Sequence, residues 1–325
     1  MGKQGCLCDA LTAVDEAGDG PEPRGQARFT WSAGAGPRPP ADDGSARHLE
    51  AMAALGIERL LDAHSHWFPE SVERKIWRYF DEHYWNVAYR EPRQERREWM
   101  RRNGAERFTV LTYAHRTGMA EWLNEWVAGF AQEVPEAIPC GTFFPEPGAG
   151  RAVRRCIEEY GFRGFKLHIQ VSAFDPNDGL LEEAFEQIAH AELPVVIHIG
   201  NGPQPGPYTS PVFLRRLLAR HNRLKVVVAH MGAMEFDEYL RIAEDYDTVY
   251  LDTTMVFVGF SACGEYPKAS LRRMQKLSGR VLFGSDFPTI PYAYSHAVEG
   301  ILALPFSVDE KKGILGENAA ALFGV

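Results

Sequence analysis

Two histidines near residue 65 have the spacing of a metal-binding pair. Residues 60–68 read Leu-Leu-Asp-Ala-His-Ser-His-Trp-Phe and follow an apolar run that begins at Ile57. In an extended chain, residues two apart point the same way, so His64 and His66 share one face. Two imidazoles at a strand end can hold one ion, but a metal needs three or more ligands. A structural or surface role remains the alternative unless ligands also come from elsewhere in the chain.

Polar residues follow apolar runs at several later points. These residues are Lys166 and His168 after Gly164-Phe165, His198 after Pro194–Ile197, His230 after Val226–Ala229, and Asp286 after Val281–Ser285. Any one of them could be a core or loop residue. Because a polar group at the end of an apolar strand needs a partner, we expect these side chains to gather around one site.

The rest of the chain alternates strand-like and helix-like segments, which is typical of parallel strands joined by helices. We predict an α/β protein with a (β/α)8 TIM barrel, whose active site lies at the carboxyl ends of the strands. The expected strands are 57–63, 108–113, 137–144, 164–169, 194–199, 225–230, 249–254 and 281–285. A helical, aromatic-rich insertion is expected at 69–103, after the first strand.

The composition separates a short head from this barrel and excludes several classes of partner. Residues 1–46 are rich in Gly and Pro without helix or strand periodicity and are predicted to be a disordered, flexible head; residues 47–325 form the barrel domain. The net charge of −9 argues against nucleic acid or an anionic membrane as partner. No apolar run suits a membrane span or signal peptide, and the five cysteines lack a disulfide framework, so a cytoplasmic protein with reduced thiols is expected.

The combined motifs resemble those of a known enzyme superfamily. They are Asp62-Ala63-His64-Ser65-His66, Gly164-Phe165-Lys166-Leu167-His168, Val196-Ile197-His198, Ala229-His230-Met231-Gly232 and Gly284-Ser285-Asp286-Phe287-Pro288. Residues 57–325 thereby resemble the amidohydrolase superfamily. Within it, they are similar to the amidohydrolase-related (amidohydrolase 2) branch that includes aminocarboxymuconate semialdehyde decarboxylase and γ-resorcylate decarboxylase.

The resemblance implies a role for each of these positions. It implies metal ligands at His64, His66, His198 and Asp286, and acid/base catalysis by His230 together with Asp286. One Zn²⁺ per chain is expected. Mn²⁺, or a binuclear site in which a carboxylated Lys166 bridges two ions and His230 becomes a ligand, is the alternative.

Two reactions fit this set, and we expect hydrolysis. In hydrolysis, a metal-activated water attacks an amide or lactone-like bond of a small molecule. The alternative is non-oxidative decarboxylation of a small aromatic or unsaturated carboxylate, and the rival from another class is a non-catalytic barrel that only binds a ligand. A homo-oligomer is compatible with the resemblance.

Several residues are candidates for contact with the substrate or for support of the site. The substrate-binding candidates are Lys166, His168, Trp67, His115 and Arg116. For each of them, packing on the barrel or a surface contact is the alternative. Asp62 could orient a ligand histidine or cap its strand, and the Gly/Pro-rich run 200–207 could shape the entrance to the site.

Overall fold

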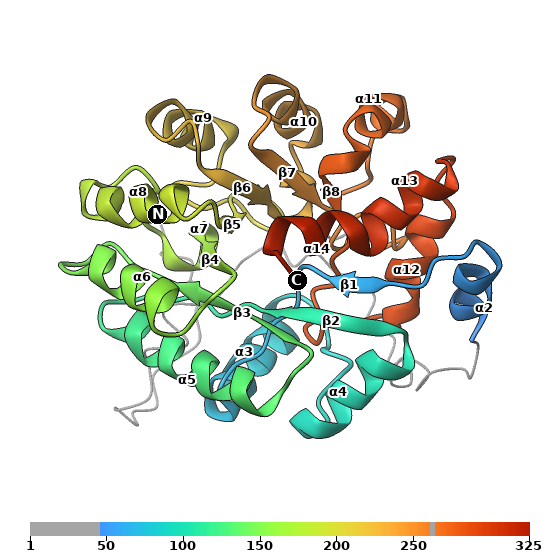
Figure 1. Cartoon of the computed structure of the whole chain (residues 1–325), viewed down its shortest axis with the longest axis horizontal. Coiled ribbons are helices and arrows are strands. Elements are labelled where there is room, and N and C mark those ends of the chain that lie inside the picture. The colour runs from blue at the N-terminus through green and yellow to red at the C-terminus, as the bar shows by residue number, and fades with distance from the viewer. Residues whose placement is uncertain (1–45, 261–263) are drawn as a thin grey trace, which may run out of the picture.

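Eight parallel strands follow one another in chain order around a barrel, which confirms the predicted fold class (Figure 1). This computed structural model describes residues 46–260 and 264–325. The strands are β1 Leu60–Asp62, β2 Ala105–Val110, β3 Ala137–Thr142, β4 Gly164–His168, β5 Pro194–His198, β6 Lys225–Val228, β7 Val249–Asp252 and β8 Val281–Leu282. All eight end one to three residues earlier than predicted, because the chain turns away toward the site close to where the polar residues begin.

Hydrogen bonds just beyond β1 and β8 close the barrel. The Ala63 amide donates to the Phe283 carbonyl at 2.9 Å, and the His66 amide donates to the Phe287 carbonyl at 2.7 Å. In the other direction, the Asp286 amide donates to the His64 carbonyl at 2.9 Å. The segments that carry the first and last candidate ligands are therefore hydrogen-bonded neighbours, although they are more than 200 residues apart in the sequence.

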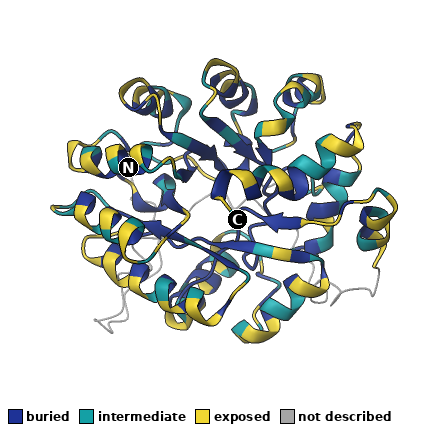
Figure 2. Cartoon of the chain, viewed as in Figure 1, coloured by how far each residue is buried: buried dark blue, intermediate teal, exposed yellow. Residues whose placement is uncertain are grey.

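Helices surround the strands with their apolar faces turned inward (Figure 2). In α6 Ala149–Glu158, the buried Ala149, Val153 and Cys156 recur at helical spacing, whereas Arg151 and Arg154 are not buried. The remaining outer helices are α5 Met119–Glu133, α8 Glu182–His190, α9 Pro211–Arg220, α10 Phe236–Asp245, α11 Leu271–Lys276 and α12 Tyr294–Leu302. Three shorter helices are α2 Arg47–Ala54, α7 Ile169–Ser172 and α13 Val308–Lys312.

The last helix, α14 Asn318–Phe323, closes the amino-terminal end of the barrel. It lies across the barrel opening in Figure 1, and its apolar residues share a core cluster with Leu61 and Leu282 of the strands. Gly164, the first residue of β4, makes room for this plug, since a Cβ there would come within 2.9 Å of Phe323. The carboxyl end remains as the place for a site.

The predicted insertion consists of two helices, α3 Glu70–His83 and α4 Arg93–Arg102. A buried ion pair joins them: Arg96 donates to Glu73 from Nη1 at 3.0 Å and from Nη2 at 2.6 Å. The Arg96 guanidinium also lies over the rings of Trp67 and Trp77, at 5.2 Å from each centroid. This pair fixes the position of α3 against α4.

Two further sequence predictions concern the flexible head and membrane-spanning segments. The predicted Gly/Pro-rich head lies outside the described residues, apart from its last position. Of the helices in the described ranges, none is both long and apolar enough to cross a bilayer.

Candidate active site

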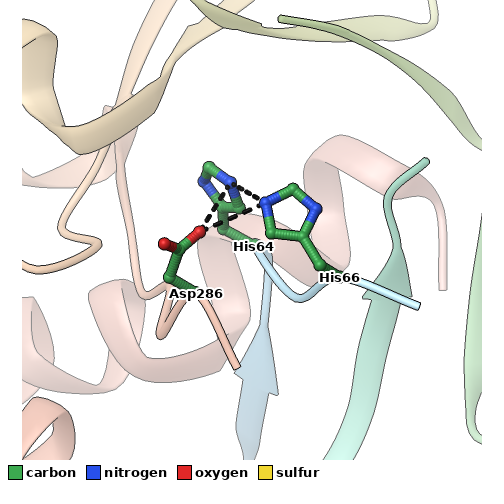
Figure 3. A group of neighbouring side chains, drawn as sticks. All are labelled: His64, His66 and Asp286. Carbon is green, nitrogen blue, oxygen red and sulfur yellow. Dashed lines mark hydrogen bonds and ion pairs between the residues drawn. The ribbon is translucent and has the colours of Figure 1, made fainter. Parts of the chain in front are cut away.

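Three of the four expected metal ligands converge at the carboxyl end of the barrel (Figure 3). His64 and His66 follow β1, and Asp286 follows β8. Nε2 of His64 lies 3.2 Å from Nε2 of His66 and 3.5 Å from Oδ1 of Asp286, and Nε2 of His66 lies 3.2 Å from the same oxygen. All three residues are buried.

The geometry of this group fits one divalent ion. Ligand atoms about 2.1 Å from a common ion lie roughly 3.0–3.4 Å from one another. Two of the observed separations, 3.2 Å each, lie within this range, and the third, 3.5 Å, lies just above it. Two imidazole nitrogens and a carboxylate oxygen are also ligands that zinc and similar ions accept.

Hydrogen bonds leave the converging nitrogens of His64 and His66 free. Nδ1 of His64 lies 2.9 Å from Oδ2 of Asp252, and Nδ1 of His66 lies 3.0 Å from the Leu111 carbonyl. An acceptor oxygen requires a proton on the facing nitrogen, so in the neutral rings Nε2 carries the free electron pair. Burial lowers the pKa of His64 to about 3, with a further lowering by Lys166, which keeps this ring neutral.

His198 and His230 are held by the same kind of hydrogen bond. Nε2 of His198 lies 2.9 Å from the Gly202 carbonyl, and Nδ1 of His230 lies 3.2 Å from the Thr254 carbonyl. The free electron pairs are therefore on Nδ1 of His198 and Nε2 of His230. The two ring centroids are 4.8 Å apart, and that of His230 lies 5.2 Å from that of His64. Within the described residues, His198 falls outside the group whose ligand atoms all lie within 4.8 Å of one another.

Asp286 combines a low pKa with an unusual backbone conformation. Burial alone would raise the pKa of this carboxyl, but the contact with His66 and the proximity of His230 hold it well below its usual range. Asp286 is therefore an anion at neutral pH. Its φ of +69° and that of His230, +54°, lie in the left-handed region, where backbone strain of about 1–3 kcal/mol is common at functional sites.

Asp252, at the end of β7, is a site residue that the sequence analysis missed. Besides holding Nδ1 of His64, this buried carboxylate accepts the His230 amide at 2.9 Å through Oδ1. It thus orients one histidine ring and fixes the backbone of another, as acceptors behind metal-binding histidines commonly do. The pattern that could have identified Asp252 is the same as for the histidines, because it is a polar residue at the end of an apolar strand, Val249–Asp252.

We expect Asp252→Asn to weaken metal binding about 10–100-fold while leaving the barrel folded. An asparagine cannot offer an oxygen to both Nδ1 of His64 and the His230 amide. If its NH2 group faces Nδ1, the ring must carry its proton on Nε2, the atom needed by the metal. Competition with a chelator measures the affinity, and Asp245→Asn, an exposed carboxylate paired with Arg215, is the matched control. Equal affinities in both variants would contradict this role.

The Asp62 carboxylate accepts hydrogen bonds from backbone amides and hydroxyls, in contrast to the suggestion that it orients the ring of a ligand histidine. This buried carboxylate accepts the amides of His64 and Ser285, each at 3.1 Å, together with the hydroxyls of Ser285 and Tyr294. It ties β1 to the segment after β8. Its contribution is to hold the two ligand-bearing segments together.

Lys166 and His168 of β4 both lie beside the histidines. Nζ of Lys166 is 3.1 Å from Nε2 of His64 and is fully buried, and burial lowers the pKa of this amine to about 8. Because Nε2 of His64 is unprotonated, the lysine is the donor. The His168 ring stacks on His198, with centroids 4.1 Å apart and ring planes 11° apart.

A cavity of about 230 Å³ opens onto this cluster. Five aromatic side chains form part of its wall: Tyr79, Phe80, Tyr84, Trp85 and Tyr113. Its polar side contains His66, His168, His198, His230 and Asp286. Residues 203–207 of the Gly/Pro-rich loop also line the cavity, in agreement with the expectation that this loop shapes the entrance.

Four of the five expected substrate-binding residues are not in this cavity wall: Lys166, which lies beside His64, and Trp67, His115 and Arg116. Trp67 is fully buried behind β1, where it packs on Phe108 and donates from Nε1 to the Ser65 hydroxyl at 3.0 Å. His115 and Arg116 line a separate cavity. The expectation fails for Trp67 because it follows His66 by one position and points to the opposite side of the chain.

Comparisons with known proteins agree with the barrel and its motifs. Residues 61–325 match the family described as Amidohydrolase. No curated protein matches the chain significantly. Among solved structures, the uncharacterized TIM-barrel protein Bb4693 from Bordetella bronchiseptica is 20% identical, with a TM-score of 0.66 over 82% of this chain and 98% of that one.

Two decarboxylases have the same fold. The 5-carboxyvanillate decarboxylase from Novosphingobium aromaticivorans, solved with manganese and 4-hydroxy-3-methoxy-5-nitrobenzoic acid, is 15% identical (TM-score 0.59; 82% of this chain, 96% of that one). The 2,6-dihydroxybenzoate decarboxylase from Rhizobium is also 15% identical (TM-score 0.60; 82% and 99%). At such identities the likeness concerns the fold.

Proposed function

The chain belongs to the amidohydrolase family, and from this premise we propose that it is a metal-dependent decarboxylase of a small aromatic carboxylate. The observation that carries the proposal is the cavity beside the histidines, which has the size of a substituted ring, an aromatic wall and, among its described lining residues, no lysine or arginine. The similarity in fold to two aromatic acid decarboxylases supports the same choice over hydrolysis, the reaction expected from the sequence.

The size of the cavity suits a single ring. An apolar cavity of about 150 Å³ holds a benzene molecule, so the 230 Å³ here leave room for ring substituents. The rings of Tyr79, Phe80 and Tyr113 can stack on a substrate ring or contact it edge to face. The hydroxyls of the tyrosines can accept or donate hydrogen bonds to substituents.

The charge in the cavity favours loss of CO2. Among the described residues that line it, there is no lysine or arginine. A carboxylate placed against the aromatic side of the wall, away from the ion, loses hydration without gaining an ion pair there, whereas neutral CO2 loses little. The wall therefore destabilises the substrate carboxylate relative to the product.

One divalent ion would be held by His64, His66, Asp286 and Nδ1 of His198. When bound, such an ion supplies a Lewis acid that polarises a substrate oxygen. Zinc is the ion expected from the sequence, and manganese is the candidate suggested by the Novosphingobium enzyme. In a site with one ion, Lys166 would remain an uncarboxylated amine beside His64.

His230 is the residue that we assign to proton transfer. Decarboxylation breaks the bond between the ring carbon and the carboxyl carbon, and its electron pair stays on the ring carbon, which must then gain a proton. Nε2 of His230 is the free nitrogen of a ring that lines the cavity. Burial lowers the pKa of this imidazole, so once protonated by solvent it gives up its proton readily.

The test is an assay for CO2 release on metal-loaded protein with hydroxybenzoates such as 2,6-dihydroxybenzoate, beside a panel of lactones and amides. We expect one metal ion per chain, CO2 release that stops on metal removal and returns on readdition, and a loss of about 10²–10⁴-fold in His230→Asn. Hydrolysis of a lactone or amide without CO2 release would overturn the proposal. Two ions per chain would bring Lys166 and His230 into the ligand set.

A further inference from the structure

A second cavity, of about 440 Å³, lies between the starts of α3 and α5 and the loop that follows β2. Its wall combines the cationic Lys75 and Arg116, the buried His115 and the apolar Val72, Met119 and Trp122. None of these residues lines the cavity at the metal cluster. The second cavity is therefore a separate feature that the proposed reaction does not use.

Two positive charges, on Lys75 and Arg116, line this cavity, and neither forms an ion pair with a described residue. Among the described residues, neither Lys75 nor Arg116 has a carboxylate within ion-pair distance, whereas most arginines of the neighbouring α4 are paired. The carboxylates nearest in the chain are engaged elsewhere: Glu70 with Arg74, and Glu73 with Arg96. Glu146 accepts the Gly118 amide at 2.7 Å at the edge of the cavity, so it can offset one of the two charges at most.

His115 is the strongest indication of a missing partner. His115 is only 7% exposed, and neither nitrogen of its ring has a hydrogen-bond partner among the described residues. Buried polar groups in proteins are nearly always satisfied, because a buried group that lacks a hydrogen-bond partner has lost its hydration without compensation. Burial lowers the pKa of this ring to about 4, with further lowering by Arg116 and Lys75, so it is neutral near pH 7 and retains one N–H donor.

The helix ends add to the positive potential. The first turns of α3 and α5 both border the cavity, through Ser71 and Met119. Neither helix has a side chain capping its amino terminus. Helix amino termini attract anions through their free amides and their dipole.

We propose that this second cavity binds an oxyanion, a phosphate or carboxylate group, carried by a small molecule with an apolar body. Arg116 and Lys75 would hold the oxyanion, and His115 would donate its remaining N–H to it. A cavity of this volume exceeds the needs of a free phosphate ion. The ring of Trp122, whose residue is 46% exposed, offers a face for the apolar part.

Calorimetric titration of the full-length, metal-loaded protein at constant ionic strength tests the site, with inorganic phosphate and phenyl phosphate as probes. The double variant K75A/R116A should bind both probes at least about tenfold more weakly. The control R78A/R272A removes two positive charges from exposed positions outside the cavity and should bind like the wild type. Trp122→Ala should reduce the affinity for phenyl phosphate and leave that for phosphate unchanged.

Three outcomes would overturn the proposal. One is no saturable binding of either probe to the wild type. Another is equal weakening in K75A/R116A and R78A/R272A, which would indicate a general effect of charge. The third is unchanged binding in K75A/R116A, which would place the anion elsewhere, such as at the metal. These results are independent of the decarboxylase proposal, because none of them is read from CO2 release.

Discussion

Asp286→Asn should abolish metal binding at the histidine cluster and reduce the rate of CO2 release by at least about 10²–10³-fold. Asp286 supplies the only carboxylate of the described group of three, and its oxygen lies 3.2–3.5 Å from the two histidine nitrogens. Without its charge, neutral imidazoles alone must hold the cation. The barrel should remain folded, since asparagine tolerates the left-handed φ of +69° that this position requires.

Elemental analysis of protein purified without chelator measures the first effect, and the CO2 assay measures the second. The matched control is Asp245→Asn, which removes a carboxylate from the surface of α10. A variant at position 286 that retained the full metal content of the wild type would show that the ion is held elsewhere. Asparagine is preferable to alanine, because an alanine with positive φ would add strain to the loss of the charge.

Arg96→Met should lower the free energy of unfolding by about 3–5 kcal/mol, because it leaves the carboxylate of Glu73 buried and unpaired. The side chains of Arg96 and Glu73 are 2% and 4% exposed, and two hydrogen bonds join them. The arginine also fills the space between Trp67 and Trp77. The pair anchors α3, which carries Tyr79 and Phe80 of the cavity wall.

Denaturant unfolding of two further variants separates the charge from the packing. Glu73→Gln combined with Arg96→Met removes both charges and should lose less stability than Arg96→Met alone. Arg101→Met, which breaks an exposed pair with Glu98 on the same helix, should leave the unfolding curve unchanged. If the double variant is as unstable as the single one, lost packing rather than an unpaired charge is the cause.

Much of the fold could be predicted because it depends on local pattern. The apolar runs before Lys166, His198 and His230 predicted strands, and those strands occur as β4, β5 and β6. Helical periodicity predicted the insertion, which forms α3 and α4. Strand ends were less predictable, since hydrogen bonds to neighbouring strands decide where a strand stops, and β8 has only two residues.

The sequence by itself determined that His64, His66, His198, His230 and Asp286 gather at the carboxyl end of the barrel, because parallel strands all deliver their next residues to the same rim. The tertiary structure alone decided which nitrogen of each histidine is free, since the acceptors come from other segments: Asp252, Leu111, Gly202 and Thr254. It also decided that His115 and Arg116 face a second cavity. The path of the loop after β2 depends on its contacts with α3 and α5, which no periodicity along the chain encodes.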